Sequence, residues 1–129
     1  MKMKLVSVYV DDQEKALRFY TEVLGFLKKA DFSNGPFRWL TVVSPDDPSG
    51  TELQLARNDD PAAEAYQRAL FERNQSALQL STEDVHGDCE RIRARGGELT
   101  MPPTDVTGST IARLSDGCGN LIQLTQLRW

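Results

Sequence analysis

The sequence has little of the side-chain chemistry on which metal-dependent and nucleophilic enzymes rely. It contains one histidine, His86, and two cysteines, Cys89 and Cys118, which show no CxxC spacing. A Ser/His/Asp or Cys/His assembly would have to include His86, which we place on an exposed helix face beside Glu83 and Asp84. Cysteines without a paired framework indicate free thiols in a reducing cytoplasm.

Positive charge and long apolar runs are also scarce. The net charge is −4, with 40% hydrophobic and 26% charged residues. Nucleic acids and anionic membrane surfaces are disfavoured as partners, because binding to either requires clustered Lys and Arg. No window approaches the roughly 18 apolar residues of a membrane-spanning helix, and residues 5–10 are too short a run for a signal peptide. We expect a single compact cytoplasmic domain.

The chain does contain one order of predicted elements that is used twice. Alternating apolar residues predict a strand at 5–10, and Asp11 or Asp12 caps a helix that ends at Gly25. Further strands are predicted at 27–32, 37–43 and 51–56. Pro61 begins a helix that runs to about Arg73. The opening order then returns, with a strand at 77–81, a helix from Glu83 or Asp84 to Gly96-Gly97, and strands near 98–101, 110–114 and 121–127.

Internal similarity supports a duplication. Superposing Asp12 on Asp84 places Leu5 on Ala77 and Gly25 on Gly97 at one offset, and residues 50–55 align with residues 119–124 after a shift absorbed by loops. We predict an α+β fold of two βαβββ modules in tandem, residues 1–57 and 76–129, joined by a linker helix in residues 58–75, within a single domain.

A module of this size buries too little apolar area to fold alone. The bare sheet faces of the two modules should therefore pair around a shared cavity. Pairing within one chain and pairing between two chains use the same surfaces, and the sequence does not distinguish them.

Side-chain alternation assigns each strand residue to one of two sheet faces. The aliphatic set is expected to pack under the helices: Val6, Val8, Val10, Leu53, Leu55, Leu78, Leu80, Ile122 and Leu124. The opposite set is mixed and partly polar: Leu5, Ser7, Tyr9, Glu52, Gln54, Ala77, Gln79, Ser81, Leu121, Gln123 and Thr125. A solvent-exposed sheet face would look similar, but uncharged amides at the equivalent positions Gln54 and Gln123 favour a ligand-binding cleft.

The middle strands and the C-terminus add further candidates. Trp39 or Arg38 in the first module, and Arg113 in the matching strand of the second, are suited to gripping an aromatic or anionic ligand. Periodicity does not decide whether Trp39 or Arg38 faces the cleft. Glu52 is a candidate general base if it is buried, and the alternative is a solvated or Arg-paired carboxylate. Trp129 either packs across a dimer or lies on the surface.

Two stretches of the sequence resemble the vicinal oxygen chelate superfamily: residues 8–20 (VYVDDQEKALRFY) followed by Val23-Leu24-Gly25-Phe26, and residues 116–124 (DGCGNLIQL). This superfamily includes glyoxalase I, extradiol dioxygenases, fosfomycin-resistance transferases and bleomycin-resistance proteins. The resemblance covers nearly the whole chain. It implies the paired βαβββ fold, also called the glyoxalase/bleomycin-resistance/dihydroxybiphenyl-dioxygenase fold, and commonly a homodimer with cavities between modules.

The resemblance also implies where a metal would be bound. The metalloenzymes of the superfamily carry ligands at the positions that match Leu5, Gln54, Ala77 and Gln123. The family usually has His or Gln at the first, His at the third, and Glu at the second and fourth, so this sequence departs at every position. Leu5 and Ala77 have no donor atom, and amide oxygens are weak neutral ligands for a divalent ion. We expect no metal and no other cofactor.

The resemblance and the departures together predict a metal-independent binding protein similar to the bleomycin-resistance proteins. It would hold a small organic molecule in the inter-module cleft, without covalent chemistry, through Leu5, Ser7, Tyr9, Trp39, Glu52, Gln54, Ala77, Gln79, Arg113 and Gln123. The alternative is a lyase, isomerase or dioxygenase of the same superfamily that uses Glu52 or displaced metal ligands. The sequence identifies neither the ligand nor a reaction.

Overall fold

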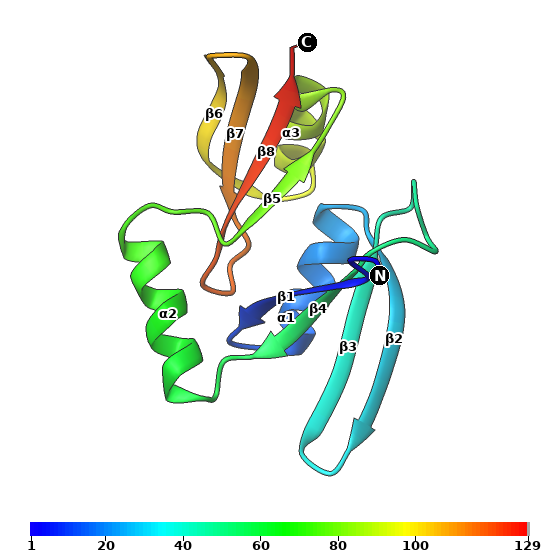
Figure 1. Cartoon of the computed structure of the whole chain (residues 1–129). Coiled ribbons are helices and arrows are strands. Elements are labelled where there is room, and N and C mark those ends of the chain that lie inside the picture. The colour runs from blue at the N-terminus through cyan, green and yellow to red at the C-terminus, as the bar shows by residue number, and fades with distance from the viewer. Residues whose placement is uncertain (129) are drawn as a thin grey trace.

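A computed structural model of the chain describes residues 1–128, and Trp129 lies outside the described residues. The first module contains β1 (Leu5–Val10), α1 (Gln13–Arg18), a π-helix η1 (Phe19–Val23), β2 (Leu27–Asn34), β3 (Phe37–Val43) and β4 (Glu52–Arg57). The second contains β5 (Leu78–Ser81), α3 (Val85–Ala94), β6 (Glu98–Val106), β7 (Ser109–Ser115) and β8 (Leu121–Leu127), and α2 (Pro61–Glu72) joins them (Figure 1). The predicted α+β fold of two tandem βαβββ modules is confirmed. None of the helices within residues 1–128 is long and apolar enough to cross a membrane.

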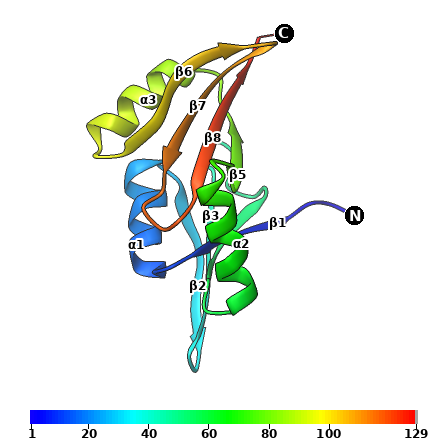
Figure 2. The same cartoon turned by 90° about the vertical axis from the view of Figure 1, so that its left-hand side faces the viewer.

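The two modules have the same sheet topology. The strand orders are β1-β4-β3-β2 and β5-β8-β7-β6, and in each sheet the first strand pairs in parallel with the last while the other pairs are antiparallel. Figure 2 shows α1 and α3 on the same side of the molecule. The sheet faces that these helices leave uncovered therefore turn toward the other side, and the β2–β3 hairpin extends beyond the rest of the first module.

Capping aspartates begin the helix of each module. Asp12 accepts a hydrogen bond from the backbone N–H of Lys15 at 3.1 Å, and Asp84 accepts one from Gly87 at 3.0 Å. The first of these bonds lowers the pKa of Asp12, because it stabilises the ionised carboxylate. The short Asp12 and Asp84 side chains thus start two equivalent helices, as their positions in the repeat predicted.

The ends of these helices correct the predicted alignment of the repeat. Both helices are followed by a glycine with positive φ, but the two are Gly25 (φ +84°) and Gly96 (φ +88°), and Gly97 is not in this conformation. The first helix therefore holds one residue more than the second between its capping aspartate and its terminal glycine. The extra residue is accommodated in η1, where the N–H of Leu24 bonds to the carbonyl of Phe19 five residues earlier.

One continuous apolar core joins the two modules on the helix-covered side of the sheets. It includes Val10 and Leu55 from the first module and Leu114 and Ile122 from the second, all fully buried. Val6 was expected in this set but is 42% exposed, and Leu78 and Leu80 are only half-buried. These three residues lie on the edge strands β1 and β5, and on β1 the core covers only Val8 and Val10, farther along the strand.

A buried hydrogen-bond network crosses the boundary between the modules. The hydroxyl of Tyr20, in η1, donates to Oδ2 of Asp116, in the β7–β8 turn, at 2.7 Å. Oδ1 of Asp116 accepts the backbone N–H groups of Cys118 and Asn120 at 2.7 and 3.0 Å. The side-chain amide of Asn120 donates to Asp116 at 2.8 Å and to the carbonyl of Tyr9, in β1, at 2.7 Å. The Asp116 carboxylate is thus fully buried and stabilised by four donors.

The linker helix is tied into the same network through Gln67. Its amide nitrogen donates to the carbonyls of Tyr9 and Cys118, both at 2.9 Å, and its amide oxygen accepts from Asn58 at 2.7 Å. Gln67 is buried, so these bonds satisfy groups that water cannot reach. The network therefore connects β1, α2 and the β7–β8 turn.

Burial in this region predicts a loss of stability at alkaline pH. Burial raises the pKa of the Cys118 thiol from its ordinary 9.0 to about 12, and burial together with Asp116 raises the pKa of Tyr20 well above 10.0. The unfolded chain releases these protons before the folded chain does, so the free energy of unfolding should fall as pH rises, from pH 9 for Cys118 and from pH 10 for Tyr20. Each group contributes a slope of up to about 1.4 kcal/mol per pH unit.

Denaturation midpoints measured between pH 8 and 11 test this prediction. Cys118→Ala and Tyr20→Phe should each lose a smaller amount of stability over this range than the unsubstituted protein does. Equal pH slopes in all three proteins would contradict it.

Candidate ligand-binding site

We call the sheet surface left uncovered by α1 the open face of the first module, and the surface left uncovered by α3 the open face of the second. On the first, strand register places Ser7, Gln54 and Thr41 side by side across three strands. The Ser7 hydroxyl donates to Oε1 of Gln54 at 2.8 Å, and the Thr41 hydroxyl donates to Oε1 of Glu52 at 2.6 Å. Glu52 is half-buried, its carboxylate is hydrogen-bonded to Thr41, and no arginine within residues 1–128 forms an ion pair with it.

Three aromatic side chains gather farther along the same face, on the β2–β3 hairpin. The rings of Phe32 and Trp39 are stacked with their centroids 6.4 Å apart, and Phe37 lies 6.5 Å from Trp39. Phe32 and Phe37 are 60% and 53% exposed, while Trp39 is half-buried beneath them. We call this group the aromatic cluster. A contiguous exposed group of apolar side chains is typical of a ligand- or partner-binding surface.

The register of the hairpin decides between Trp39 and Arg38. Arg38 points to the opposite face, where its guanidinium forms an ion pair with Glu14 at 2.7 Å and a bidentate pair with Asp31 at 2.8 Å. The hydrogen bond from Arg38 lowers the pKa of Asp31, because it stabilises the charged carboxylate. Trp39 thus lies on the open face, whereas Arg38 lies on the opposite face and connects the hairpin to α1 through its ion pair with Glu14.

The open face of the second module carries a row of longer polar side chains. Register aligns Gln79, Gln123 and Arg113 across β5, β8 and β7, with Met101 of β6 next to Arg113. Nε of Arg113 donates to Oε1 of Gln123, and Nη1 donates to the carbonyl of Asn74, both at 3.2 Å. The residues on either side of Arg113 in sequence, Ala112 and Leu114, are fully buried on the other face.

Within one chain, the two open faces are not closed over each other. Leu5, on the first strand, is 43% exposed, and Phe32 and Phe37 of the aromatic cluster remain mostly exposed. Both open faces turn to the same side of the molecule, away from α1 and α3 (Figure 2). The ten residues predicted to line the cleft therefore lie on the two open faces, and two pockets found within residues 1–128 are lined by none and by three of them, respectively.

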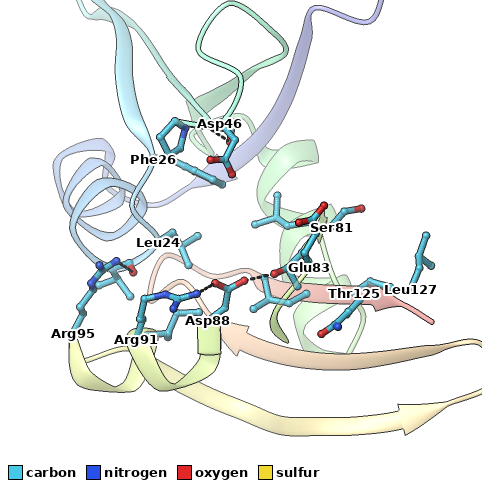
Figure 3. A pocket seen from close by; sticks show the side chains of 18 residues that line it. Leu24, Phe26, Asp46, Ser81, Glu83, Asp88, Arg91, Arg95, Thr125 and Leu127 are labelled. Atoms are coloured by element: carbon cyan, nitrogen blue, oxygen red, sulfur yellow. Dashed lines mark hydrogen bonds and ion pairs between the residues drawn. The ribbon is translucent and has the colours of Figure 1, made fainter. Parts of the chain in front are cut away.

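A pocket of about 990 Å³ lies elsewhere, at the module junction next to α3 (Figure 3). None of the ten predicted residues lines it; Leu24 and Phe26 contribute from the first module, and the ends of β5, β8 and α3 contribute from the second. Its Asp88 accepts hydrogen bonds from Arg91 and from Thr82. The Asp88 carboxylate is therefore already paired within the protein.

A much smaller slot, of about 70 Å³, lies between β1, α2 and the start of β5. It is lined by three of the predicted residues, Ser7, Tyr9 and Ala77, together with Tyr66 and Leu70 of the linker helix. Its size suits a water molecule or a single small group rather than a whole ligand. It marks the point at which the two open faces approach each other within one chain.

The residues at the family's metal positions do not fit a divalent ion. Leu5 and Ala77 have no donor atom, Oε1 of Gln54 accepts from Ser7, and Oε1 of Gln123 accepts from the cationic guanidinium of Arg113. A positive charge bonded to the oxygen that a metal would need opposes metal binding at that point. Within residues 1–128, no three His, Cys, Asp or Glu side chains cluster at a distance suited to a metal ion.

The remaining candidates for reactive groups lie away from the open faces. His86 is exposed on α3, whereas Cys89 and Cys118 are buried and unpaired. Burial raises the pKa of both thiols, so neither is a ready nucleophile at neutral pH.

Sequence reasoning missed two members of the aromatic cluster, Phe32 and Phe37. The available signal was the turn between them: Gly35, at φ +61°, and Pro36 form a two-residue hairpin loop that pairs Asn34 with Phe37 and Phe32 with Trp39. A two-residue loop fixes which residues face each other. The pairing set by this loop predicts that the rings of Phe32, Phe37 and Trp39 lie on one face of the hairpin.

Comparisons with known proteins place this chain in a family. Residues 2–124 match the model of the Glyoxalase/Bleomycin resistance protein/Dioxygenase superfamily, and the chain belongs to this superfamily. YurT of Bacillus subtilis (strain 168), described as uncharacterized, is 46% identical over 126 residues, which cover 98% of this chain and 99% of YurT.

Other relatives have names that point in two directions. TnmS3, described as an antibiotic binding protein from Streptomyces sp. CB03234, has a crystal structure with a TM-score of 0.79 and 33% identity, covering 99% of this chain and 97% of TnmS3. A probable lactoylglutathione lyase of Vibrio cholerae is 28% identical, covering 91% of this chain and 84% of that protein. Superfamily membership alone therefore leaves binding and catalysis both open.

Proposed function

We propose that this protein is a cytoplasmic, metal-independent binding protein that sequesters a planar aromatic small molecule, such as an antibiotic, without covalent chemistry. The observation that carries the proposal is the aromatic cluster of Phe32, Trp39 and Phe37, which lies exposed on the open face of the first module. Aromatic side chains supply large contact areas with little loss of conformational freedom. A flat ring system can stack on them while the neighbouring polar groups orient it.

The chemistry of the surrounding side chains supports binding rather than catalysis. Ser7, Gln54 and Gln123 offer neutral hydrogen-bonding groups, and the metal positions hold no set of donors suited to a divalent ion. The Glu52 carboxylate accepts the Thr41 hydroxyl, which gives it a structural role on the open face. TnmS3, with 33% identity over nearly the whole chain, is described as antibiotic binding, which favours the same class of ligand.

A homodimer is part of the proposal, because one chain leaves both open faces uncovered. A second copy would place the open face of its second module over the aromatic cluster of the first chain and complete a closed cleft. The exposed Leu5 and Phe37 would then be buried, as expected for apolar side chains at the centre of an interface. This arrangement assigns the ten predicted cleft residues to a site shared by two chains.

The test is a panel of planar aromatic antibiotics and matched saturated compounds, with melting temperature and calorimetry as readouts. A ligand present at 100 times its Kd should stabilise the protein by about 2.7 kcal/mol, and the saturated compounds should have no effect. The same preparation should sediment at twice the chain mass of 14.5 kDa.

Catalysis is the result that would overturn the proposal. Turnover of a glutathione hemithioacetal of an oxoaldehyde, or ring cleavage of a catechol, after addition of divalent metal would identify an enzyme. Loss of that turnover in Glu52→Gln, with the melting temperature unchanged, would assign the reaction to Glu52.

A further inference from the structure

We propose that Arg113 is the anchoring residue for an anionic oxygen group of the ligand, a carboxylate or phenolate, at the position where metalloenzymes of the superfamily hold their metal. The inference rests on the proposed function and adds to it a charge requirement: the aromatic ligand carries a negative charge next to its ring system. Neither the family match nor the relatives' names assign such a role to this residue.

The guanidinium of Arg113 is held in place but not neutralised. Its two hydrogen bonds go to neutral acceptors, Oε1 of Gln123 and the carbonyl of Asn74. Asn74 adopts the left-handed conformation, with φ +58°, at the end of the linker helix. These bonds use Nε and Nη1, and within residues 1–128 no protein acceptor is recorded for Nη2. A planar donor group that is oriented in advance and still has a free edge is suited to binding a carboxylate.

In the described part of the chain, Arg113 differs from the other arginines in being half-buried without a carboxylate partner. Within residues 1–128, only Arg38 and Arg113 are half-buried, and all other arginines are exposed. Arg38 has two carboxylate partners, Glu14 and Asp31. Among residues 1–128, no carboxylate oxygen lies within 4.0 Å of a guanidinium nitrogen of Arg113. A partly desolvated cation without a counter-ion gains more from a bound anion than an exposed or already paired one does.

The position of Arg113 explains why its charge bears on the ligand. It lies in one row with Gln79 and Gln123 across the open face of the second module, and Gln123 is at a metal-ligand position of the family. A guanidinium at this point supplies positive charge without a metal. It therefore favours a ligand oxygen that carries negative charge and disfavours a divalent cation.

The experiment compares two probes with the same ring system, anthracene-2-carboxylate and the uncharged anthracene-2-carboxamide, on the full chain by calorimetry. The unsubstituted protein should bind the carboxylate at least about 10-fold more tightly. Arg113→Gln should abolish this preference by weakening carboxylate binding, while amide binding changes less than about 2-fold. Arg113→Lys, which keeps the charge but not the planar fork, should retain part of the preference.

Arg18→Gln is the matched control. It removes the same unit of charge at an exposed position on α1 that lies outside both open faces. It should bind both probes as the unsubstituted protein does. Raising the salt concentration should weaken carboxylate binding more than amide binding. Melting temperatures identify any variant that has lost its fold, and Arg113→Lys then provides the comparison.

The outcomes separate this inference from the proposed function. Equal affinity for the two probes, or a carboxylate preference that survives in Arg113→Gln, would overturn the role of Arg113 and leave aromatic binding in place. Binding of neither probe, nor of any aromatic compound in the panel, would overturn the proposed function itself.

Discussion

Replacing Asp116 with alanine is expected to lower the free energy of unfolding by about 3–5 kcal/mol. The Asp116 carboxylate is buried and accepts hydrogen bonds from Tyr20, from the backbone of Cys118, and from the backbone and side chain of Asn120. Removing it leaves these donors without partners in a region that water does not reach. For a chain of this length, the loss corresponds to a fall of about 10–20 °C in melting temperature.

The size of this effect follows from the position of Asp116 between the modules. Tyr20 belongs to the first module and Asp116 to the second, and their bond joins residues 96 positions apart in the chain. Asn120 carries the connection on to β1 through the carbonyl of Tyr9. Losing the carboxylate should therefore loosen the packing between modules and not only the β7–β8 turn.

Urea unfolding at one fixed protein concentration measures the loss, with two variants for comparison. Tyr20→Phe removes a single hydrogen bond to the carboxylate and should cost about 1.5–3 kcal/mol. Asp59→Ala removes an exposed carboxylate that pairs with Arg57 on the surface and should change stability by less than about 0.5 kcal/mol. The interpretation fails if Asp116→Ala costs no more than Asp59→Ala.

Short-range patterns in the sequence predicted the modules well. β3 and β8 have the predicted bounds, 37–43 and 121–127, and α2 begins at the predicted Pro61. The capping bonds of Asp12 and Asp84 also lie where the repeat placed them. These features depend on neighbouring residues only, so the sequence contains the information needed to recognise them.

Features that depend on distant contacts were not predictable in this way. The extra residue in η1 does not alter helical periodicity enough to be seen, and it shifted the predicted alignment of the second helix end from Gly96 to Gly97. The contact of Tyr20 with Asp116 depends on how the modules pack. Val6 shares a strand and a face with the buried Val8 and Val10, so its exposure depends on how far the core extends along β1, which is set by packing rather than by local sequence.

The candidate site falls between these two cases. Alternation correctly separated the open-face residues Gln54 and Gln123 from the buried Leu53 and Ile122. It did not decide between Trp39 and Arg38, because two adjacent residues of a strand point in opposite directions and the register had not been established. The hairpin loop at Gly35 and Pro36 establishes that register and brings Phe32 against Trp39.

Trp39→Ala is expected to weaken binding of anthracene-2-carboxylate by about 10- to 100-fold while leaving the protein folded. Trp39 is the central ring of the aromatic cluster, with Phe32 and Phe37 on either side at 6.4 and 6.5 Å. Its loss removes the surface on which a planar ligand stacks and also releases both neighbours. Because Trp39 is only half-buried on the open face, the free energy of unfolding should change less than for a core aromatic residue.

Calorimetry with two comparison variants separates the role of the ring from a general loss of apolar surface. Trp39→Phe keeps an aromatic ring and should retain most of the affinity. Phe71→Ala removes an exposed aromatic side chain from α2, outside both open faces, and should bind the probe as the unsubstituted protein does. If Trp39→Ala binds as tightly as Phe71→Ala, the aromatic cluster is not where the ligand stacks, and the open face of the first module is not the binding surface.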